Sequence, residues 1–468
     1  MLEPEKNPTP GLIVDPPAWL RMILSRWVLR PEADPVLRAT RRAKAEAQRR
    51  RKDEPHTVTY FHQLDDPYAH LAAQVLAEFG KRYEIALKVH LIRATGGNSQ
   101  PELDKLQIWA RRDAELIAPH LGLAFPTHAE TLPTPDRQVL AGRALIGAGD
   151  AATVEKIAAV SEALWAGDDD ALARFAAEGS SEAELERALD EGSARLQKGC
   201  HYSGAMFAYG GEWYWGVDRL HHLELRLRDL GACIDPKASF LAPRPRPDVS
   251  DVDARALRLD FYPSLNSPYT AIVYDQTIAM KDACGIEFHH KPVLPMVMRG
   301  VPAPMPKARY IMFDTQREAE FAGVAFGDLV MPIGTPTRRA YSMLPWAMEQ
   351  GKDEALMSSL LRHAFALGVG LHKDAGMRQA VEAAGLDWAA AQSVIGSDDW
   401  KAMVERNQDE LVDGLGLWGV PCYKLSGPAG EPDIAVWGQD RLWLIAAEII
   451  RRSALNSTNV ASLSAERF

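Results

Sequence analysis

The chain has 468 residues, enough for two or three domains, and its 47% apolar and 25% charged residues are typical of a globular protein. A formal net charge of −10 argues against a nucleic-acid-binding surface that spans the whole protein. No run of 18 apolar residues occurs, so the sequence predicts no membrane span. The N-terminus has acids and prolines where a secretory signal needs a basic and an apolar stretch, and we expect a cytoplasmic location.

Residues 1–56 are expected to form an arm ahead of the folded domains. The arm opens Pro-rich, continues through an apolar patch around Trp19 and Trp27, and ends in the basic block "RATRRAKAEAQRRRKDEP". A basic block can contact nucleic acid or an acidic membrane surface. We favour a simpler interpretation, a solvated helix that packs Trp19 and Trp27 against the body of the protein.

The rest of the sequence contains one unit twice. With an offset of 201 residues, "LDDPYAHLAAQV" (64–75) faces "LNSPYTAIVYDQ" (265–276), and the same register continues for more than 70 residues. The pairs with identical residues include Tyr68 with Tyr269, Asp113 with Asp314, Gly122 with Gly323, Phe125 with Phe326 and Arg137 with Arg338. Searching for repeats first therefore identifies a duplication. We place the two domains at 57–231 and 258–455, a Pro-rich linker at 232–257, and a polar tail at 456–468.

Each copy is predicted to be an α/β domain of thioredoxin type. A strand-like run, "HTVTYF" or "LRLDFY", precedes a helix that starts with proline, and a second strand follows. Helical periodicity dominates 104–195 and 306–412. A hairpin and a helix that starts at "WGVDRL" or "WGQDRL" end each copy. The fold class is therefore two tandem thioredoxin-like domains, each with a helical insertion.

The start of the second copy's first helix is the place where we expect chemistry. Ser267 lies just before Pro268, where free N–H groups of the helix stabilise an anion and the hydroxyl can cap the helix or donate to that anion. Val420-Pro421 precedes a hairpin strand, where we expect a cis peptide bond and a backbone that can pair with an extended ligand.

The spacing of "SPY", of Val-Pro before the hairpin and of "WGQDRL" resembles the 2-hydroxychromene-2-carboxylate isomerases and kappa-class glutathione transferases, a branch of the DsbA-like thioredoxin-fold superfamily. The resemblance covers both copies but not the arm or the linker. It implies glutathione as the cofactor, with its sulfur held as a thiolate by Ser267, where other branches have a redox cysteine.

The same resemblance implies roles for five further residues. The backbone of Val420 would pair with the cysteinyl part of glutathione, with Pro421 as the cis-proline. Gln439 and Asp440 match positions that bind the γ-glutamyl end. Arg299 falls where the family has a lysine near the glycyl carboxylate, although "GVPAPMP" after it departs from the usual Gly-Asn loop.

The first copy departs from this pattern. Asp66 replaces the serine, and Gly204-Ala205 replaces Val-Pro. A carboxylate beside a thiolate is disfavoured by repulsion, so we expect the first copy to have lost the glutathione site. Asp66 remains a candidate general acid/base or a ligand for a cation. His62 could join Asp65 and Asp66 in a metal site, but a surface turn is the interpretation we favour, and we predict no metal.

The other histidines and the cysteines carry no predicted function. His289 and His290 should point to opposite faces of a strand, and His221 and His222 should face solvent. Four scattered cysteines without a CxxC pair support neither a dithiol redox site nor a zinc knuckle, and we expect each to be buried or half-buried. These are Cys200, Cys233, Cys284 and Cys422.

By resemblance, the reaction is a glutathione-dependent isomerisation or transfer on an aromatic or conjugated electrophilic small molecule. Members of the family act as homodimers, so we expect either an intramolecular pair of the two copies or a homo-oligomer. No nucleic-acid partner is expected. The alternative function is a non-catalytic tandem domain protein that binds peptides along the Pro421 edge, and the lack of CxxC disfavours a disulfide oxidoreductase.

Overall fold

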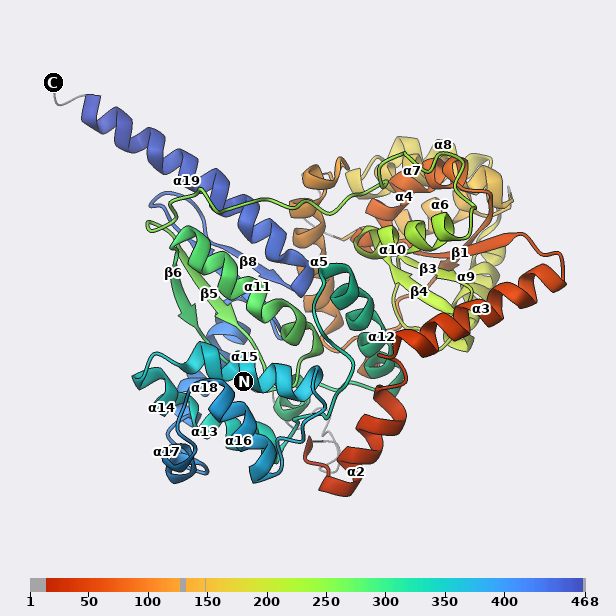
Figure 1. Ribbon diagram of the computed structural model, residues 1–468. Helices are drawn as coiled ribbons and strands as arrows, with labels where there is room; N and C mark the ends of the chain where they lie inside the picture. The colour runs from red at the N-terminus through yellow and green to blue at the C-terminus, as the bar shows by residue number, and fades with distance from the viewer. Residues whose placement is uncertain (1–13, 127–131, 148, 466–468) are drawn as a thin grey trace. The chain divides into compact units, whose positions relative to one another are not determined.

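A computed structural model describes residues 14–126, 132–147 and 149–465 (Figure 1). The chain divides into two compact units. The first unit is Arg38–Pro245, and the second unit joins the described residues up to Leu37 with those from Arg246 onward. One boundary falls within 232–257, the predicted linker, whereas the other divides the predicted arm between the units. The Pro-rich start of the arm, residues 1–13, and residues 466–468 of the predicted tail lie outside the described residues.

The first unit is a four-stranded mixed sheet with helices. Strand β1 (His56–Gln63) pairs in parallel with β2 (Ile85–Ile92) and antiparallel with β3 (Met206–Tyr209), which pairs with β4 (Glu212–Trp215). The helices are α3 (Pro35–Arg51), α4 (Pro67–Arg82), α5 (Leu103–Ile117), α6 (Pro135–Leu145), α7 (Asp150–Ala166), α8 (Asp169–Ala177), α9 (Glu182–Lys198) and α10 (Gly216–Asp229), with short 3-10 turns η2 (Gly97–Ser99) and η3 (Pro119–Leu121).

The second unit repeats this plan. Strand β5 (Arg258–Tyr262) pairs in parallel with β6 (Glu287–His290) and antiparallel with β7 (Cys422–Ser426), which pairs with β8 (Ile434–Trp437). The helices of this unit are α2 (Ala18–Ile23), α11 (Pro268–Cys284), α12 (Met305–Ala322), α13 (Thr335–Ser342), α14 (Leu344–Glu349), α15 (Asp353–Phe365), α16 (Asp374–Ala383), α17 (Trp388–Val394), α18 (Lys401–Asp409) and α19 (Leu442–Ala465). Short turns are η1 (Leu24–Leu29), η4 (Met296–Arg299), η5 (Glu410–Gly414) and η6 (Gln439–Arg441).

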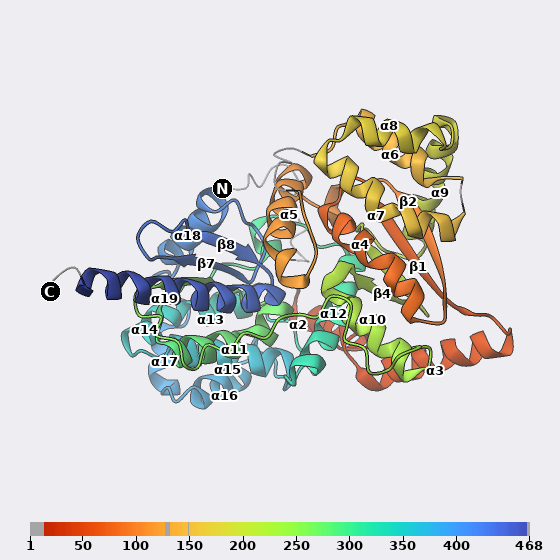
Figure 2. The same cartoon turned by 90° about the horizontal axis from the view of Figure 1, so that it is seen from above.

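The two sheets have the same strand order, β2-β1-β3-β4 and β6-β5-β7-β8, which confirms the predicted α/β fold of thioredoxin type. Strands β1 and β5 are rich in β-forming residues, among which Tyr60 and Phe261 are fully buried. Each strand leads into a helix with proline in its first turn. Helices α11 and α19 lie side by side against the second sheet (Figures 1 and 2). The helical insertions lie between the second and third strands of each sheet, as predicted.

Three local predictions were wrong. Cys200 is exposed rather than buried. His221 and His222 are buried rather than solvent-facing, because the segment around Phe240 lies against this part of α10, with its ring centre 6.3 Å from that of His221. Residues 456–465, expected to be a tail, continue helix α19.

The tryptophans of the arm do not pack on the body of the protein, contrary to prediction. The side chains of Trp19 and Trp27 are 65% and 73% exposed. The buried face of this helix instead carries Arg21, Ser25 and Leu29. Hydrogen bonds explain this orientation. The Arg21 guanidinium donates to the carbonyls of Met331 and Ile333, and the Ser25 hydroxyl accepts from the Met331 N–H.

No helix in the described part of the chain combines the length and the hydropathy that a membrane span requires.

Candidate active site at the start of helix α11

Ser267 is the N-cap of α11, in the turn that follows β5. Its backbone is extended (φ −97°, ψ 115°), and its Oγ accepts a hydrogen bond from the Thr270 N–H at 3.1 Å. The same hydroxyl donates to the Val420 carbonyl at 3.4 Å, so the fold joins two predicted site residues that are 153 positions apart. The Ser267 side chain is 8% exposed. The fold therefore brings these two segments into contact at the carboxyl end of β5.

The loop before β7 completes this corner of the site. The Val420-Pro421 peptide bond is cis, as the sequence predicted. The Pro421 carbonyl accepts from the Gly438 N–H at 2.9 Å, which ties the loop to the end of β8. Cys422 follows directly, but it is fully buried and burial raises the pKa of its thiol well above the ordinary value. This cysteine is therefore not a thiolate at neutral pH.

Gln439 and Asp440 lie in the η6 turn, which contacts α11. The Gln439 amide donates to the Glu318 carboxylate on α12 at 2.6 Å. Asp440 is half-buried, and one of its carboxylate oxygens lies 3.7 Å from the Arg441 guanidinium. The fold thus brings both residues to the helix that Ser267 caps, with the side chain of Gln439 held by an acid that the sequence reasoning did not single out.

Arg299 is buried and does not lie on an exposed rim of the site. Its side chain is 7% exposed, and its Nε and Nη2 donate to the carbonyls of Leu294 (2.9 Å) and Trp418 (2.7 Å). Burial lowers the pKa of Arg299 to about 10. The guanidinium therefore braces the loop two residues before Val420. Its Nη1 is buried and has no hydrogen-bond partner among the described residues.

Two polar atoms beside Ser267 lack partners as well. The Asn266 Oδ1 and the Thr270 Oγ1 are buried and form no hydrogen bond within the described parts of the chain. Since buried polar atoms are nearly always hydrogen-bonded, such a pair indicates a place where water or a ligand completes the bonding. Sequence reasoning missed both residues, although their position beside the serine in "NSPYT" could have drawn attention to them.

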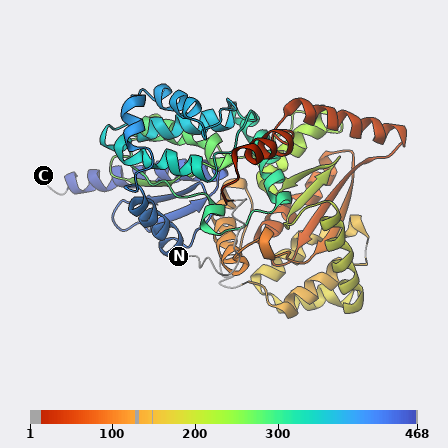
Figure 3. The same ribbon diagram turned by 90° about the horizontal axis from the view of Figure 1, so that it is seen from below.

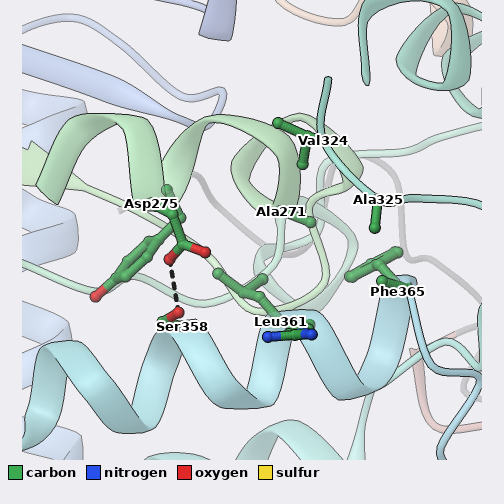
Figure 4. Close-up of a pocket in the computed structure, with 10 residues that line it drawn as sticks. Ala271, Asp275, Val324, Ala325, Ser358, Leu361 and Phe365 are labelled. Carbon is green, nitrogen blue, oxygen red and sulfur yellow. Dashed lines mark hydrogen bonds between the residues drawn. The ribbon is translucent and has the colours of Figure 1, made fainter. Parts of the chain in front are cut away.

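A cavity of about 180 Å³ opens between α11 and α15, beginning one helical turn after Ser267 (Figure 4). Its walls combine apolar and polar side chains, and at one end the Ser358 hydroxyl donates to the Asp275 carboxylate at 2.6 Å. The lining residues are Ala271, Tyr274, Asp275, Val324, Ala325, Ser358, Leu361, Arg362, Phe365 and Ala366. A cavity of this size is large enough for a single aromatic ring.

The first unit has the same turn with a different chemistry. Asp66 has nearly the dihedral angles of Ser267 (φ −97°, ψ 114°) and caps α4 by accepting from the Tyr68 N–H at 2.9 Å. Gly204 stands where the second unit has Val420, and a β-carbon there would lie 2.6 Å from the Asp66 Oδ2. Burial, assisted by the charge of Asp65, raises the pKa of Asp66 to about 7. This turn can therefore hold a proton near neutral pH.

The candidate metal set of the first unit is not formed. His62 is buried, with its Nδ1 3.3 Å from the Tyr60 hydroxyl, and burial lowers its pKa to about 3. Asp65 accepts instead from the amides of Gln63 and Gln107. The prediction of a surface turn was also wrong for His62, because its side chain is buried in the core.

The two units share one more side-chain contact. The Tyr68 hydroxyl donates to the buried Asp113 carboxylate at 2.7 Å, and the Tyr269 hydroxyl donates to the buried Asp314 carboxylate at 2.8 Å. Both pairs join the helix that follows the first strand of a unit, α4 or α11, to the first helix of its insertion, α5 or α12. The offset of 201 residues in the sequence therefore corresponds to one repeated contact.

Comparison with known proteins supports the fold of the second unit. Residues 258–449 match the family model described as a DSBA-like thioredoxin domain. No curated protein matches the chain in sequence. The second unit thus has a DsbA-like thioredoxin fold.

Solved structures similar to the chain include a 2-hydroxychromene-2-carboxylate isomerase, at 16% identity over 43% of this chain and 98% of that one, with a TM-score of 0.36. A probable DsbA oxidoreductase from Streptomyces coelicolor matches at 18% identity over 41% and 89% of the two chains, with a TM-score of 0.32. The cytosolic disulfide reductase DsbM from Pseudomonas aeruginosa matches at 15% identity over 44% and 98%, with a TM-score of 0.32.

Proposed function

We propose that the second unit binds glutathione at the Ser267 turn and uses it to isomerise or conjugate an aromatic or conjugated electrophilic small molecule. The observation that carries the proposal is the pairing of the Ser267 hydroxyl with the Val420 carbonyl at the N-terminus of a 17-residue helix. The unpartnered oxygens of Asn266 and Thr270 beside it add support, since they mark a polar site without its full set of bonds.

The Ser267 hydroxyl and the N-terminus of α11 would stabilise glutathione as a thiolate. The Ser267–Val420 hydrogen bond is long at 3.4 Å, so little is lost when the hydroxyl turns to a sulfur anion, with which it forms a stronger, charge-assisted bond. The helix N-terminus favours the same negative charge and lowers the pKa of the bound thiol. The Val420 carbonyl is then released to accept an N–H from the extended backbone of glutathione.

The remaining parts of the proposal rest on the resemblance of the motifs to the isomerase and transferase family. Gln439 and Asp440 would bind the γ-glutamyl end, and Arg299 would face the glycyl carboxylate through its unpartnered Nη1. The thiolate adds to a conjugated carbon of the electrophile, a bond rotates or a ring opens, and the thiolate leaves or stays attached. The cavity that begins at Ala271, with apolar and polar side chains in its walls, offers room for the electrophile. Glutathione is the nucleophile, and the protein orients it and stabilises its charge.

We also propose that the two units descend from one duplicated domain. The shared strand order, the matching dihedral angles of Asp66 and Ser267, and the repeated tyrosine–aspartate bond support this origin. Their pairing within one chain, in place of a homodimer, remains part of the proposal.

Calorimetric titration of the full chain with reduced glutathione tests the function. We expect Ser267→Asp to weaken binding at least tenfold, because it reproduces the first unit's turn and sets a carboxylate against the thiolate. Asp is as good an N-cap as Ser, so the helix stays intact. Ser267→Ala should also weaken binding, through loss of the hydroxyl.

Two controls make the titration decisive. Circular dichroism should be unchanged in Ser267→Asp, and the matched variant Asp66→Ser in the first unit should leave the affinity of the second unit unaltered. The proposal fails if the wild type does not bind millimolar glutathione, or if Ser267→Asp binds it as tightly as the wild type.

A non-catalytic tandem binding protein is the second candidate. The first unit favours it, because Asp66 and Gly204 replace the residues that would hold a thiolate. This function predicts that extended peptides, rather than glutathione, bind the Pro421 edge in the same titration.

A further inference from the structure

The helix formed by α2 and η1 presents an apolar stripe that nothing in the proposed function uses. Trp19, Ile23 and Trp27 recur every four residues and are 65%, 45% and 73% exposed. Four-residue spacing places side chains on one face of a helix. The π-helical turn η1 has more residues per turn than an α-helix, so Trp27 stays closer to the line of the other two.

The opposite face fixes this helix to the second unit. Arg21 is 3% exposed and donates to the carbonyls of Met331 and Ile333, while the Ser25 hydroxyl accepts from the Met331 N–H at 3.1 Å. Asp15, just before the helix, accepts from the backbone and side chain of Thr335. The contacts on the buried face therefore fix this helix to the second unit and leave the stripe exposed. Figure 3 shows the backbone of the helix in dark red.

The sequence that carries the stripe and continues after it is strongly basic. Residues 18–52 contain eleven Lys and Arg against three Asp and Glu, a net charge of +8, in a chain whose net charge is −10. Helix α3 is anchored by the Arg42 guanidinium, which donates to the Glu212 carboxylate at 2.6 and 2.8 Å. Its Lys44 and Arg51 are exposed and form no ion pair with any described residue. Only five residues separate η1 from α3, so the basic helix follows the stripe directly in the chain.

We propose that this segment docks the protein on a lipid surface that carries anionic headgroups. Tryptophan favours the boundary between headgroups and acyl chains, and an amphipathic helix binds there through apolar area together with attraction between basic residues and anionic lipid. The apolar Ile23 between the tryptophans fits a hydrocarbon boundary better than a nucleic acid. A second copy of this chain is disfavoured, because a symmetric contact would bring two segments of charge +8 together.

Co-sedimentation of the full chain with vesicles tests the proposal. We expect binding to phosphatidylcholine vesicles with about a third phosphatidylserine, weak binding to phosphatidylcholine alone, and loss of binding as salt is raised. The double variant Trp19→Ala/Trp27→Ala should bind at least tenfold more weakly. The variant Lys44→Glu/Arg51→Glu should reduce binding to anionic vesicles and leave the weak neutral binding unaltered.

A matched control is Ile108→Ala, which removes an apolar side chain that is 59% exposed on α5 and should leave vesicle binding unchanged. All the substituted side chains are exposed, so circular dichroism should not change. The proposal is overturned if the wild type binds no vesicles, or if the tryptophan variant binds them equally well. It is also overturned if the tryptophans are instead required for binding an oligonucleotide or for dimerisation in sedimentation velocity.

Discussion

Asparagine in place of Asp66 is expected to stabilise the first unit at pH 8 by at most about 4 kcal/mol, with no gain near pH 3. Burial raises the pKa of Asp66 from 3.8 to about 7, so the folded state binds a proton that the unfolded state releases near pH 4. The stability of the wild type therefore falls as the pH rises from about 4 to about 7 and is lowest above that range. Asparagine stays neutral throughout and keeps the cap on α4.

Urea unfolding of the wild type and Asp66→Asn at several pH values between about 4 and 9 measures this effect. The free-energy difference between them should grow with pH and level off above pH 7. Ser267→Asn is the matched control, because it exchanges one neutral cap for another at the equivalent turn and should add no pH dependence. A constant difference between wild type and Asp66→Asn at all pH values would contradict the raised pKa.

Replacing Arg21 by methionine is expected to destabilise the second unit by about 3 to 5 kcal/mol. Methionine keeps the apolar stem but removes the donors that the carbonyls of Pro16, Met331 and Ile333 share, and it leaves Asp15 without this cation. Buried carbonyls that lose a donor carry the full cost of desolvation.

Calorimetry of the full chain distinguishes destabilisation of the second unit from destabilisation of the whole protein. The transition of the second unit should move to lower temperature, while that of the first unit, which contains no partner of Arg21 among its described residues, should not. Arg26→Met serves as the control, because Arg26 is exposed on the same helix, with its guanidinium 6.0 Å from the centre of the Trp27 ring. Equal shifts for Arg21→Met and Arg26→Met would disprove the structural role of Arg21.

Much of the fold could be predicted, because local signals agree with one another. Proline at the first turn of a helix, β-formers before it, and one register repeated at an offset of 201 residues all indicate the same unit twice. The cis peptide bond at Val420-Pro421 could also be predicted, because a proline just before a strand is typical of this fold.

The predictions that were wrong depended on long-range contacts. Apolar composition suggested that Trp19 and Trp27 would be buried, but backbone carbonyls more than 300 residues away selected the Arg21 face of the same helix. The burial of Arg299, about which we made no prediction, depends likewise on the carbonyl of Trp418 in a distant loop. Neither partner leaves a pattern in the local sequence.

The binding of helix α2 to residues 331–333 determines when this helix can dock during synthesis. The first unit is contiguous, so it can fold while the second is still being made. Arg21, however, must wait for residue 333, which at 5–20 residues per second emerges roughly 15 to 60 s later. During that interval the amino-terminal helix lacks the carbonyls that Arg21 binds, and its tryptophans are exposed on the nascent chain.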